Sequence, residues 1–322
     1  MELTIALERY DRHVPFFDGT VKPRDGVSLK VFQVGQSHPA RDGEDRHGRM
    51  LKGEFDAAEF SMSTYLMAID RGLLITGVPV FPRRLFSAGL FFVRKDSPLR
   101  TPGDLRGKRV AIRSFQTTLS LLAKGDLKFE YGVPWEEIHW LLEDDEKIAF
   151  EPRPGLRIEH LPAGVDVGHL LRDGKVDAVI QPHPPKSMTS GAVPIRRLIE
   201  DADAEELRYF KKYGYFPIMH ILAIKQEVVA RNPSLPVTLM AMFADARAIA
   251  ADYYSDPNWS SLAFGRRYFE REQAMFSRDI WPTGLKANRT NLERFVMYSR
   301  DQGLTRGDFA VEELFAKSAR DT

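Results

Sequence analysis

Up to about residue 225, short apolar runs alternate with stretches of helical hydrophobic spacing, and this order constrains the fold more than any other feature. Such alternation is typical of α/β proteins, in which helices cover sheets. The apolar runs predict nine strands, at 3–7, 29–32, 57–60, 90–93, 109–112, 138–141, 157–160, 178–180 and 220–224. So many short strands indicate more than one sheet. From residue 226 onward the spacing predicts helices only.

The composition excludes several classes of protein. A length of 322 residues suggests two domains or one large domain. The near balance of 46 Lys and Arg with 45 Asp and Glu argues against a nucleic-acid partner. The absence of cysteine excludes disulfides, thiolate metal sites and cysteine nucleophiles. No apolar run reaches the length of a membrane span, and the chain begins at Met1 without a signal-peptide pattern, so we expect a cytoplasmic protein.

Hydroxyl and amide side chains follow two of the predicted strands, where a helix begins. Ser61, Ser63 and Tyr65 follow the strand at 57–60, and Gln116 and Thr117 follow the strand at 109–112. Ligands of open α/β sheets bind at such strand ends, and the amides of a helix N-terminus attract carboxylates. The alternative for the serines is helix capping, which we weigh equally with ligand contact.

Two histidines and two arginines are further candidates. His183 follows the strand at 178–180 between prolines, and His220 begins the strand at 220–224, so either is a possible proton donor. Arg12 and Arg84 lie beside aromatic residues and suit carboxylate binding. The alternative readings are structural histidines and surface arginines.

Motifs for cofactors and metals are missing. The chain has no Gly-x-Ser-x-Gly elbow, no phosphate-binding loop, no His-Glu-x-x-His and no dinucleotide fingerprint. One loop gathers His38, Asp42, Glu44, Asp45 and His47, but their spacing fits no metal-binding pattern. We therefore expect neither a cofactor nor a metal.

Several segments together resemble the family of 4,5-dihydroxyphthalate decarboxylases, which are related to type II periplasmic solute-binding proteins. The resemblance runs along nearly the whole chain, and its most specific segments are Ser-Met-Ser-Thr-Tyr-Leu from residue 61, Phe-Pro-Ile-Met-His from residue 216 and Trp-Pro-Thr-Gly-Leu from residue 281. One departure is the run after Phe81-Pro82, where Ser87 and Ala88 stand in place of an Arg-His pair often found in the family.

The resemblance implies an α/β, two-lobed, type II periplasmic-binding-protein-like fold with a helical C-terminal part. Lobe one would comprise 1–92 and 222–322, and lobe two 93–221, with the ligand in a cleft between them. The residues that would line this cleft are Arg12, Ser61, Ser63, Tyr65, Arg84, Gln116, Thr117, His183 and His220.

The implied activity is the cofactor-independent decarboxylation of a hydroxylated aromatic dicarboxylate such as 4,5-dihydroxyphthalate, giving protocatechuate and CO2. His220 or His183 would protonate the ring carbon, and the other seven residues would bind the substrate. The alternative is a solute-binding protein for a small carboxylate without turnover. A homo-oligomer stays possible, and no membrane partner is expected.

Overall fold

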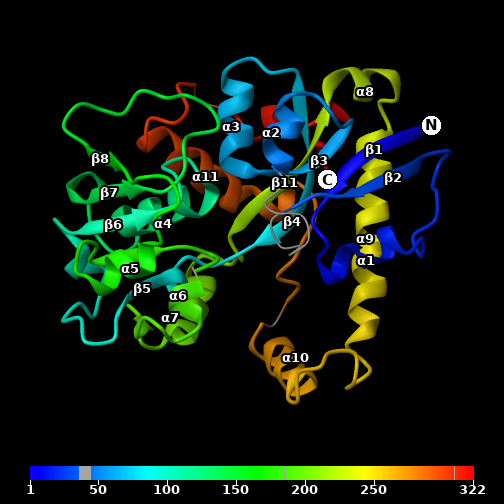
Figure 1. The fold of residues 1–322 in the computed structure, drawn as a ribbon. Coiled ribbons are helices and arrows are strands. Elements are labelled where there is room, and N and C mark those ends of the chain that lie inside the picture. The colour runs from blue at the N-terminus through cyan, green and yellow to red at the C-terminus, as the bar shows by residue number, and fades with distance from the viewer. Residues whose placement is uncertain (36–44, 185, 277, 308) are drawn as a thin grey trace. The chain divides into compact units, whose positions relative to one another are not determined.

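The computed structural model describes the chain except for residues 36–44, 185, 277 and 308. It divides into two compact units, each with its own sheet (Figure 1). Unit 1 comprises Met1–Arg84, His220–Leu292 and Phe309–Thr322, and unit 2 comprises Leu85–Met219 and Glu293–Asp308.

Unit 1 is built on a five-stranded sheet with the order β2-β1-β3-β11-β4. Its strands are β1 (Glu2–Leu7), β2 (Ser28–Gln33), β3 (Ala57–Ser61), β4 (Ile75–Arg84) and β11 (Ile218–Lys225). β1 runs parallel to β2 and β3, and β11 runs antiparallel to β3. The carboxyl ends of β1 and β3 therefore lie beside the amino end of β11, at one end of these central strands.

The helices of unit 1 are α1 (Val14–Phe17), α2 (Arg46–Leu51), α3 (Met62–Asp70), α8 (Gln226–Arg231), α9 (Leu235–Tyr253) and α10 (Gly265–Met275). Apolar side chains of α9 pack with those of β1, β4 and β11 in one core that includes Ile5, Val80, Leu222 and Phe243. This core also takes in Ala57 of β3. Since side chains alternate along a strand, the side chain of Glu59 faces the same side of the sheet as Ala57.

Unit 2 is built on a six-stranded sheet with the order β10-β5-β9-β6-β7-β8. Its strands are β5 (Phe91–Arg94), β6 (Arg109–Ile112), β7 (His139–Leu142), β8 (Arg157–His160), β9 (Ala178–Ile180) and β10 (Ile195–Arg197). The helices are α4 (Thr118–Phe129), α5 (Val167–Arg172), α6 (Lys186–Thr189) and α7 (Ala202–Tyr213), with α11 (Arg289–Asp301) contributing its residues from 293 onward.

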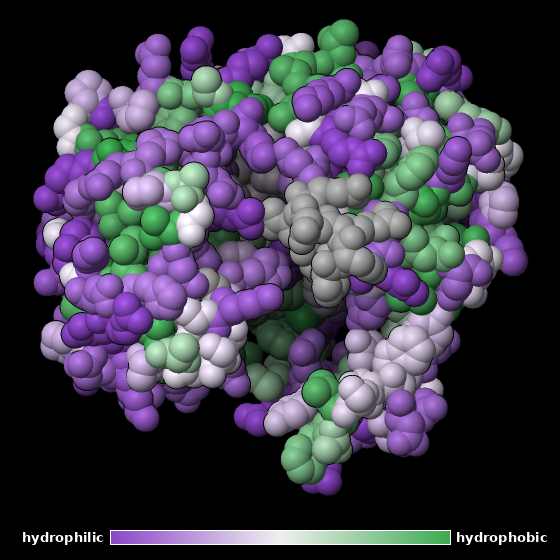
Figure 2. Space-filling model, in the orientation of Figure 1, coloured by the Kyte–Doolittle hydropathy of each residue, from purple (hydrophilic) through white to green (hydrophobic). Residues whose placement is uncertain are grey.

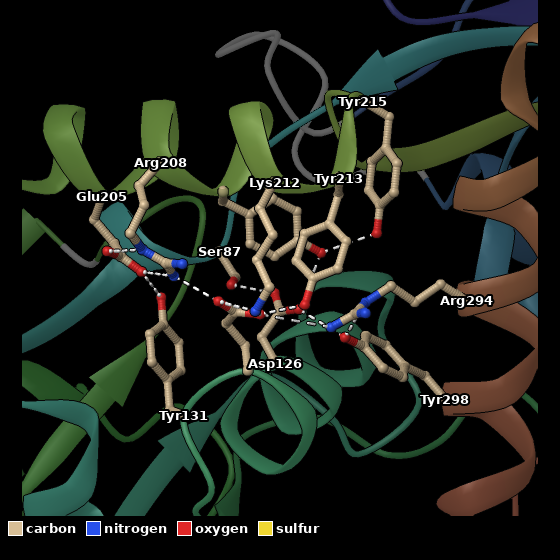
Figure 3. Close-up of polar contacts among 12 residues, drawn as sticks. Ser87, Asp126, Tyr131, Glu205, Arg208, Lys212, Tyr213, Tyr215, Arg294 and Tyr298 are labelled. Carbon is tan, nitrogen blue, oxygen red and sulfur yellow. Dashed lines mark hydrogen bonds and ion pairs between the residues drawn. The ribbon is translucent and has the colours of Figure 1, made fainter.

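The C-terminal segment Glu293–Asp308 is part of unit 2, whereas the predicted lobe one included it. Buried polar contacts explain the difference (Figure 3). The hydroxyl of Tyr298 donates to Asp126 of α4 at 2.9 Å, and the guanidinium of Arg294 lies 4.1 Å from the Tyr213 ring centroid. Ser87 donates to the same Asp126 carboxylate at 2.7 Å. No short-range sequence pattern reports contacts between residues so far apart in the chain.

All nine predicted strands overlap an observed strand, and the structure adds β4 and β10. Pro79 and Pro82 lie within β4, and proline in a sequence disfavours the prediction of a strand. Proline is tolerated here because β4 is the last strand of its sheet, where the backbone is not paired with a full strand on both sides among the described residues.

Hydrophilic side chains cover most of the face in Figure 2, and hydrophobic ones form several patches, one of them near α10. Trp259, Leu262, Phe264 and Tyr268 are exposed in this segment, and α10 itself contains no buried residue. Among the described residues, no helix is long and apolar enough to cross a membrane.

Candidate active site

A fully buried carboxylate, Glu59, lies in the middle of the unit 1 sheet. Its Oε2 accepts a hydrogen bond from the backbone N–H of Glu8 at 3.1 Å, and its Oε1 accepts one from the hydroxyl of Tyr10 at 3.1 Å. Glu8 and Tyr10 follow β1, and Glu59 lies on the neighbouring β3. The parallel pairing of these strands brings the three residues together.

Arg46, at the start of α2, provides the positive charge for this carboxylate. Its Nη2 lies 3.4 Å from Oε1 of Glu59, and its Nη1 lies 3.3 Å from Oε2 of Glu8. All three side chains are almost completely buried. Burial by itself would raise the pKa of Glu59, but Arg46 and the hydrogen bond from His220 outweigh burial and hold that pKa well below its usual range. Glu59 is therefore ionised.

His220 is paired with Glu59 across the two central strands. Its Nδ1 lies 2.5 Å from Oε1 of Glu59. An ionised carboxylate only accepts, so Nδ1 carries the hydrogen and Nε2 is left for a ligand. Burial lowers the pKa of His220 to about 4, against the opposing effect of Glu59, so the ring is neutral at pH 7. The His220 side chain is largely buried, with 8% of it exposed.

A second histidine, His47 of α2, lies against the first. The two imidazoles meet edge to face, with centroids 5.2 Å apart. The backbone N–H of Ser61 donates to Nδ1 of His47 at 2.9 Å, and Ser61 is the register partner of His220 on β11. Two imidazoles thus lie side by side at the edge of the sheet where β3 ends and β11 begins.

Arg83 of β4 adds a positive charge near both imidazoles. Burial is the main cause that lowers the pKa of His47 and of His220, and the charge of Arg83 lowers both further. For Tyr10, burial raises the pKa and the charge of Arg83 opposes that rise. The neighbouring Arg84 is 2% exposed, and its Nη2 donates to Asn288 at 2.6 Å and to the Pro282 carbonyl at 3.0 Å. Arg84 was the predicted ligand contact, but of these two neighbouring arginines it is Arg83 whose charge lowers the pKa of both histidines.

The other predicted residues of unit 1 are engaged within the chain. Arg12 donates through Nε to the Pro82 carbonyl at 2.7 Å, and its guanidinium lies between the rings of Tyr10 and Trp281. The Ser61 hydroxyl accepts from the Thr64 N–H at 3.3 Å, so the capping interpretation of Ser61 is confirmed. Ser63 is fully buried, and the Tyr65 hydroxyl donates to the Leu314 carbonyl.

The predicted residues of unit 2 form a separate group. Gln116 exchanges two hydrogen bonds with the backbone of Ile148, and the Thr117 hydroxyl contacts Ser120 at 2.6 Å. His183 is exposed in the turn that follows β9. Two backbone amides of this segment bind a carboxylate that belongs to the chain itself. The Glu146 carboxylate accepts from the N–H groups of Phe115 and Gln116, at 2.5 and 3.1 Å.

We expect the Glu146→Ala substitution to create a vacancy that a small carboxylate can fill. The loss of two charge-assisted hydrogen bonds should cost about 1–3 kcal/mol of unfolding free energy. Added acetate should then raise the thermal midpoint of the variant and leave that of the wild type unchanged. Thermal denaturation with acetate, and with chloride at equal ionic strength, measures this. An equal response of both proteins to acetate would show that these amides are not an anion site.

His13, a buried neighbour of this site, makes stability depend on pH. Its Nδ1 lies 2.8 Å from the Glu8 carbonyl, and burial lowers its pKa from 6.5 to about 4. Between these values the unfolded chain binds the proton and the native chain does not, so stability falls as the pH falls. Going from pH 7 to pH 5 should cost the wild type about 2 kcal/mol more than the His13→Asn variant, whose amide retains the hydrogen bond. Urea denaturation at both pH values tests this, and equal losses would contradict a neutral His13.

The structure describes only two of the five loop residues that were considered as metal ligands. His38, Asp42 and Glu44 lie outside the described residues. Asp45 accepts from the Gly48 N–H as the cap of α2, and His47 lies in the histidine pair. Among the described residues, no group of three His, Asp or Glu side chains is arranged to hold a metal.

Comparison with known proteins identifies the family. The chain is 30% identical, over 98% of its length and 96% of the relative's, to a 4,5-dihydroxyphthalate decarboxylase of Comamonas testosteroni. The chain belongs to the 4,5-dihydroxyphthalate decarboxylase family. A second member of this family, from Pseudomonas putida, is 27% identical over 67% of the chain and 83% of its own length. Both relatives are decarboxylases, and the predicted enzyme class, a carboxy-lyase, is confirmed. No family model matches the chain.

Solved structures show the fold of this family member. The periplasmic aliphatic sulphonate binding protein SsuA of Escherichia coli superposes with a TM-score of 0.57, at 14% identity, over 100% of the chain and 99% of SsuA. The predicted two-lobed binding-protein-like fold is thereby confirmed.

Proposed function

We propose that this family member decarboxylates a hydroxylated aromatic dicarboxylate such as 4,5-dihydroxyphthalate, giving protocatechuate and CO2. The observation that carries the proposal is the buried Glu59–His220 pair, found in a chain that aligns with a decarboxylase over 98% of its length. A histidine whose orientation is fixed by a carboxylate and which keeps one ring nitrogen for a ligand is suited to proton transfer.

The proposed substrate is activated by its own substituents. In 4,5-dihydroxyphthalate each carboxylate stands on a ring carbon that lies para to a hydroxyl group. That hydroxyl donates electron density to the ring carbon, which can then accept a proton. The C–C bond to the carboxylate breaks, CO2 leaves, and its bonding electrons restore the aromatic ring. One proton is consumed for each CO2 released.

His220 would supply this proton from Nε2. In the free protein, burial keeps the pKa of His220 at about 4. A substrate with two carboxylates brings negative charge close to the imidazole and raises the pKa of His220. His220 therefore takes up a proton when the substrate binds. Glu59 stabilises the imidazolium through Nδ1. After transfer to the ring carbon, His220 returns to its neutral form.

Arg83 is the proposed charge partner for a substrate carboxylate. The charge of the guanidinium lowers the pKa of both histidines, and Arg83 is half-buried. Its planar, permanently charged group suits a carboxylate. Gln116, Thr117 and His183 remain predicted contacts on unit 2, where an acetate response of Glu146→Ala would support a carboxylate-binding role.

The test is to incubate the purified protein with 4,5-dihydroxyphthalate and to quantify CO2 and protocatechuate by chromatography. Phthalate, which lacks the activating hydroxyls, is the matched control and should bind without releasing CO2. Equal amounts of CO2 and protocatechuate are expected. Tight binding of 4,5-dihydroxyphthalate with no product over hours would instead support a solute-binding protein, the role of its structural relative SsuA.

A further inference from the structure

The proposed mechanism uses His220 but leaves its neighbour His47 without a role. His47 is half-buried at the start of α2, and its imidazole packs between the rings of Phe60 and His220. Its only hydrogen bond among the described residues is the one its Nδ1 accepts from Ser61. The opposite nitrogen, Nε2, has no partner in the described part of the chain.

The hydrogen bond from Ser61 determines which nitrogen of His47 carries the hydrogen. A backbone N–H only donates, so Nδ1 of His47 must accept, and Nε2 carries the hydrogen. His220 has the opposite arrangement, because Nδ1 faces the ionised Glu59. The two adjacent rings therefore offer complementary groups, an N–H donor on His47 and, on His220, a nitrogen that can gain and release a proton.

The charges around His47 keep it neutral. Burial is the largest cause that holds its pKa well below the usual range. The charges of Arg46 and Arg83 and the nearness of His220 lower it further, against the opposing effect of Glu59. A neutral imidazole cannot readily give up its last hydrogen. His47 is thus suited to hold an anion by a hydrogen bond and is unsuited to transfer a proton to it.

We propose that the Nε2–H of His47 binds the carboxylate that the substrate retains and thereby selects substrates with two carboxylates on adjacent ring carbons. The inference rests on the proposed function, in which His220 protonates the carbon that loses CO2. The retained carboxylate of a phthalate stands on the very next carbon. The two imidazoles meet edge to face with centroids 5.2 Å apart, a separation that one benzene ring with two adjacent carboxylates can span.

This assignment explains why a single carboxylate would leave. Protocatechuate still has a carboxylate para to a hydroxyl, but no second carboxylate stands beside it. With His220 at the reacting carbon, nothing would remain for His47 to bind. The product would therefore be a poor substrate, and the reaction would stop after one CO2.

The matched variants are His47→Asn and His47→Gln. In the Asn variant the amide oxygen can still accept from Ser61, but the donor at the Nε2 position is lost. In the Gln variant the amide nitrogen can replace that donor. We expect the wild type to bind phthalate more tightly than benzoate, and His47→Asn to reduce this preference by about 10- to 100-fold. His47→Gln should recover a large part of it.

Calorimetry with phthalate and benzoate measures the preference without turnover, so it stays informative even if 4,5-dihydroxyphthalate is not decarboxylated. Long-range ¹H–¹⁵N spectra of the wild type, with His47 assigned from the variants, should show the Nε2–H form at pH 7 and a shift of its Nε2 signal on binding phthalate. An unchanged preference in His47→Asn, or a charged or Nδ1–H imidazole, would overturn the inference.

Discussion

The His220→Asn variant should lose about 10²–10⁴-fold in kcat, far more than it loses in affinity for a phthalate ligand. The amide nitrogen of asparagine occupies the position of Nδ1 and can still donate to Glu59, which lies 2.5 Å from Nδ1 in the wild type. What the substitution removes is Nε2, the only nitrogen of this ring that is left for a ligand. Steady-state kinetics with 4,5-dihydroxyphthalate, together with calorimetric binding of phthalate, separates the loss of chemistry from a loss of binding.

His13→Asn is the control for this substitution. His13 is also a buried histidine of unit 1, and its Nδ1 also has a partner that an asparagine amide can satisfy, the Glu8 carbonyl. We expect this variant to keep kcat within about threefold, because the rate effect requires a proton donor at the substrate. If His220→Asn retained kcat to the same extent as His13→Asn, the proton-donor assignment would be wrong.

The Arg46→Met variant should lose about 3–5 kcal/mol of unfolding free energy. Arg46 is the cation between Glu8 and Glu59, and all three side chains are buried. Methionine fills much of the volume but leaves two buried carboxylates beside each other. The pKa of Glu59 should therefore rise, and the variant should regain part of its stability as the pH is lowered and the carboxylate takes up a proton. Urea denaturation between pH 5 and pH 8 measures both effects.

Arg49→Met is the matched control, because Arg49 lies on the same helix one turn further on. Its Nε pairs with Glu54 at 2.7 Å, but 33% of the Arg49 side chain and 42% of the Glu54 side chain are exposed. An exposed pair of this kind contributes about 1 kcal/mol or less. If the two methionine variants were equally stable, the buried charge network would not be what holds α2 to the sheet.

The elements of the fold were largely predictable from the sequence because hydrophobic periodicity is a local signal. The strand at 109–112 and the one at 178–180 match β6 and β9 in both bounds. The strand β4 was missed because its prolines contradict the local pattern, and only its position at the edge of the sheet removes the contradiction. The membership of Glu293–Asp308 in unit 2 depends on contacts with Asp126, which lies more than 160 residues away in sequence.

The candidate site was predictable only in part. His220 and Ser61 were selected because polar residues at strand ends are a recognisable pattern, and they are register partners. Glu59 was overlooked although it offered a signal, a carboxylate in the middle of an apolar strand that has no place in a core without partners. Arg84 was selected instead of Arg83, because the sequence does not reveal which of two adjacent arginines acts electrostatically on the histidines.

Decarboxylation carried out in D2O tests the central claim most directly. The account predicts that each molecule of 4,5-dihydroxyphthalate releases one CO2 and gives protocatechuate with one deuterium, on the ring carbon that carried the lost carboxylate. Mass spectrometry and proton NMR of the product locate that deuterium. Recovery of the intact dicarboxylate from a protein that binds it, with no CO2 and no ring deuterium, would contradict the account.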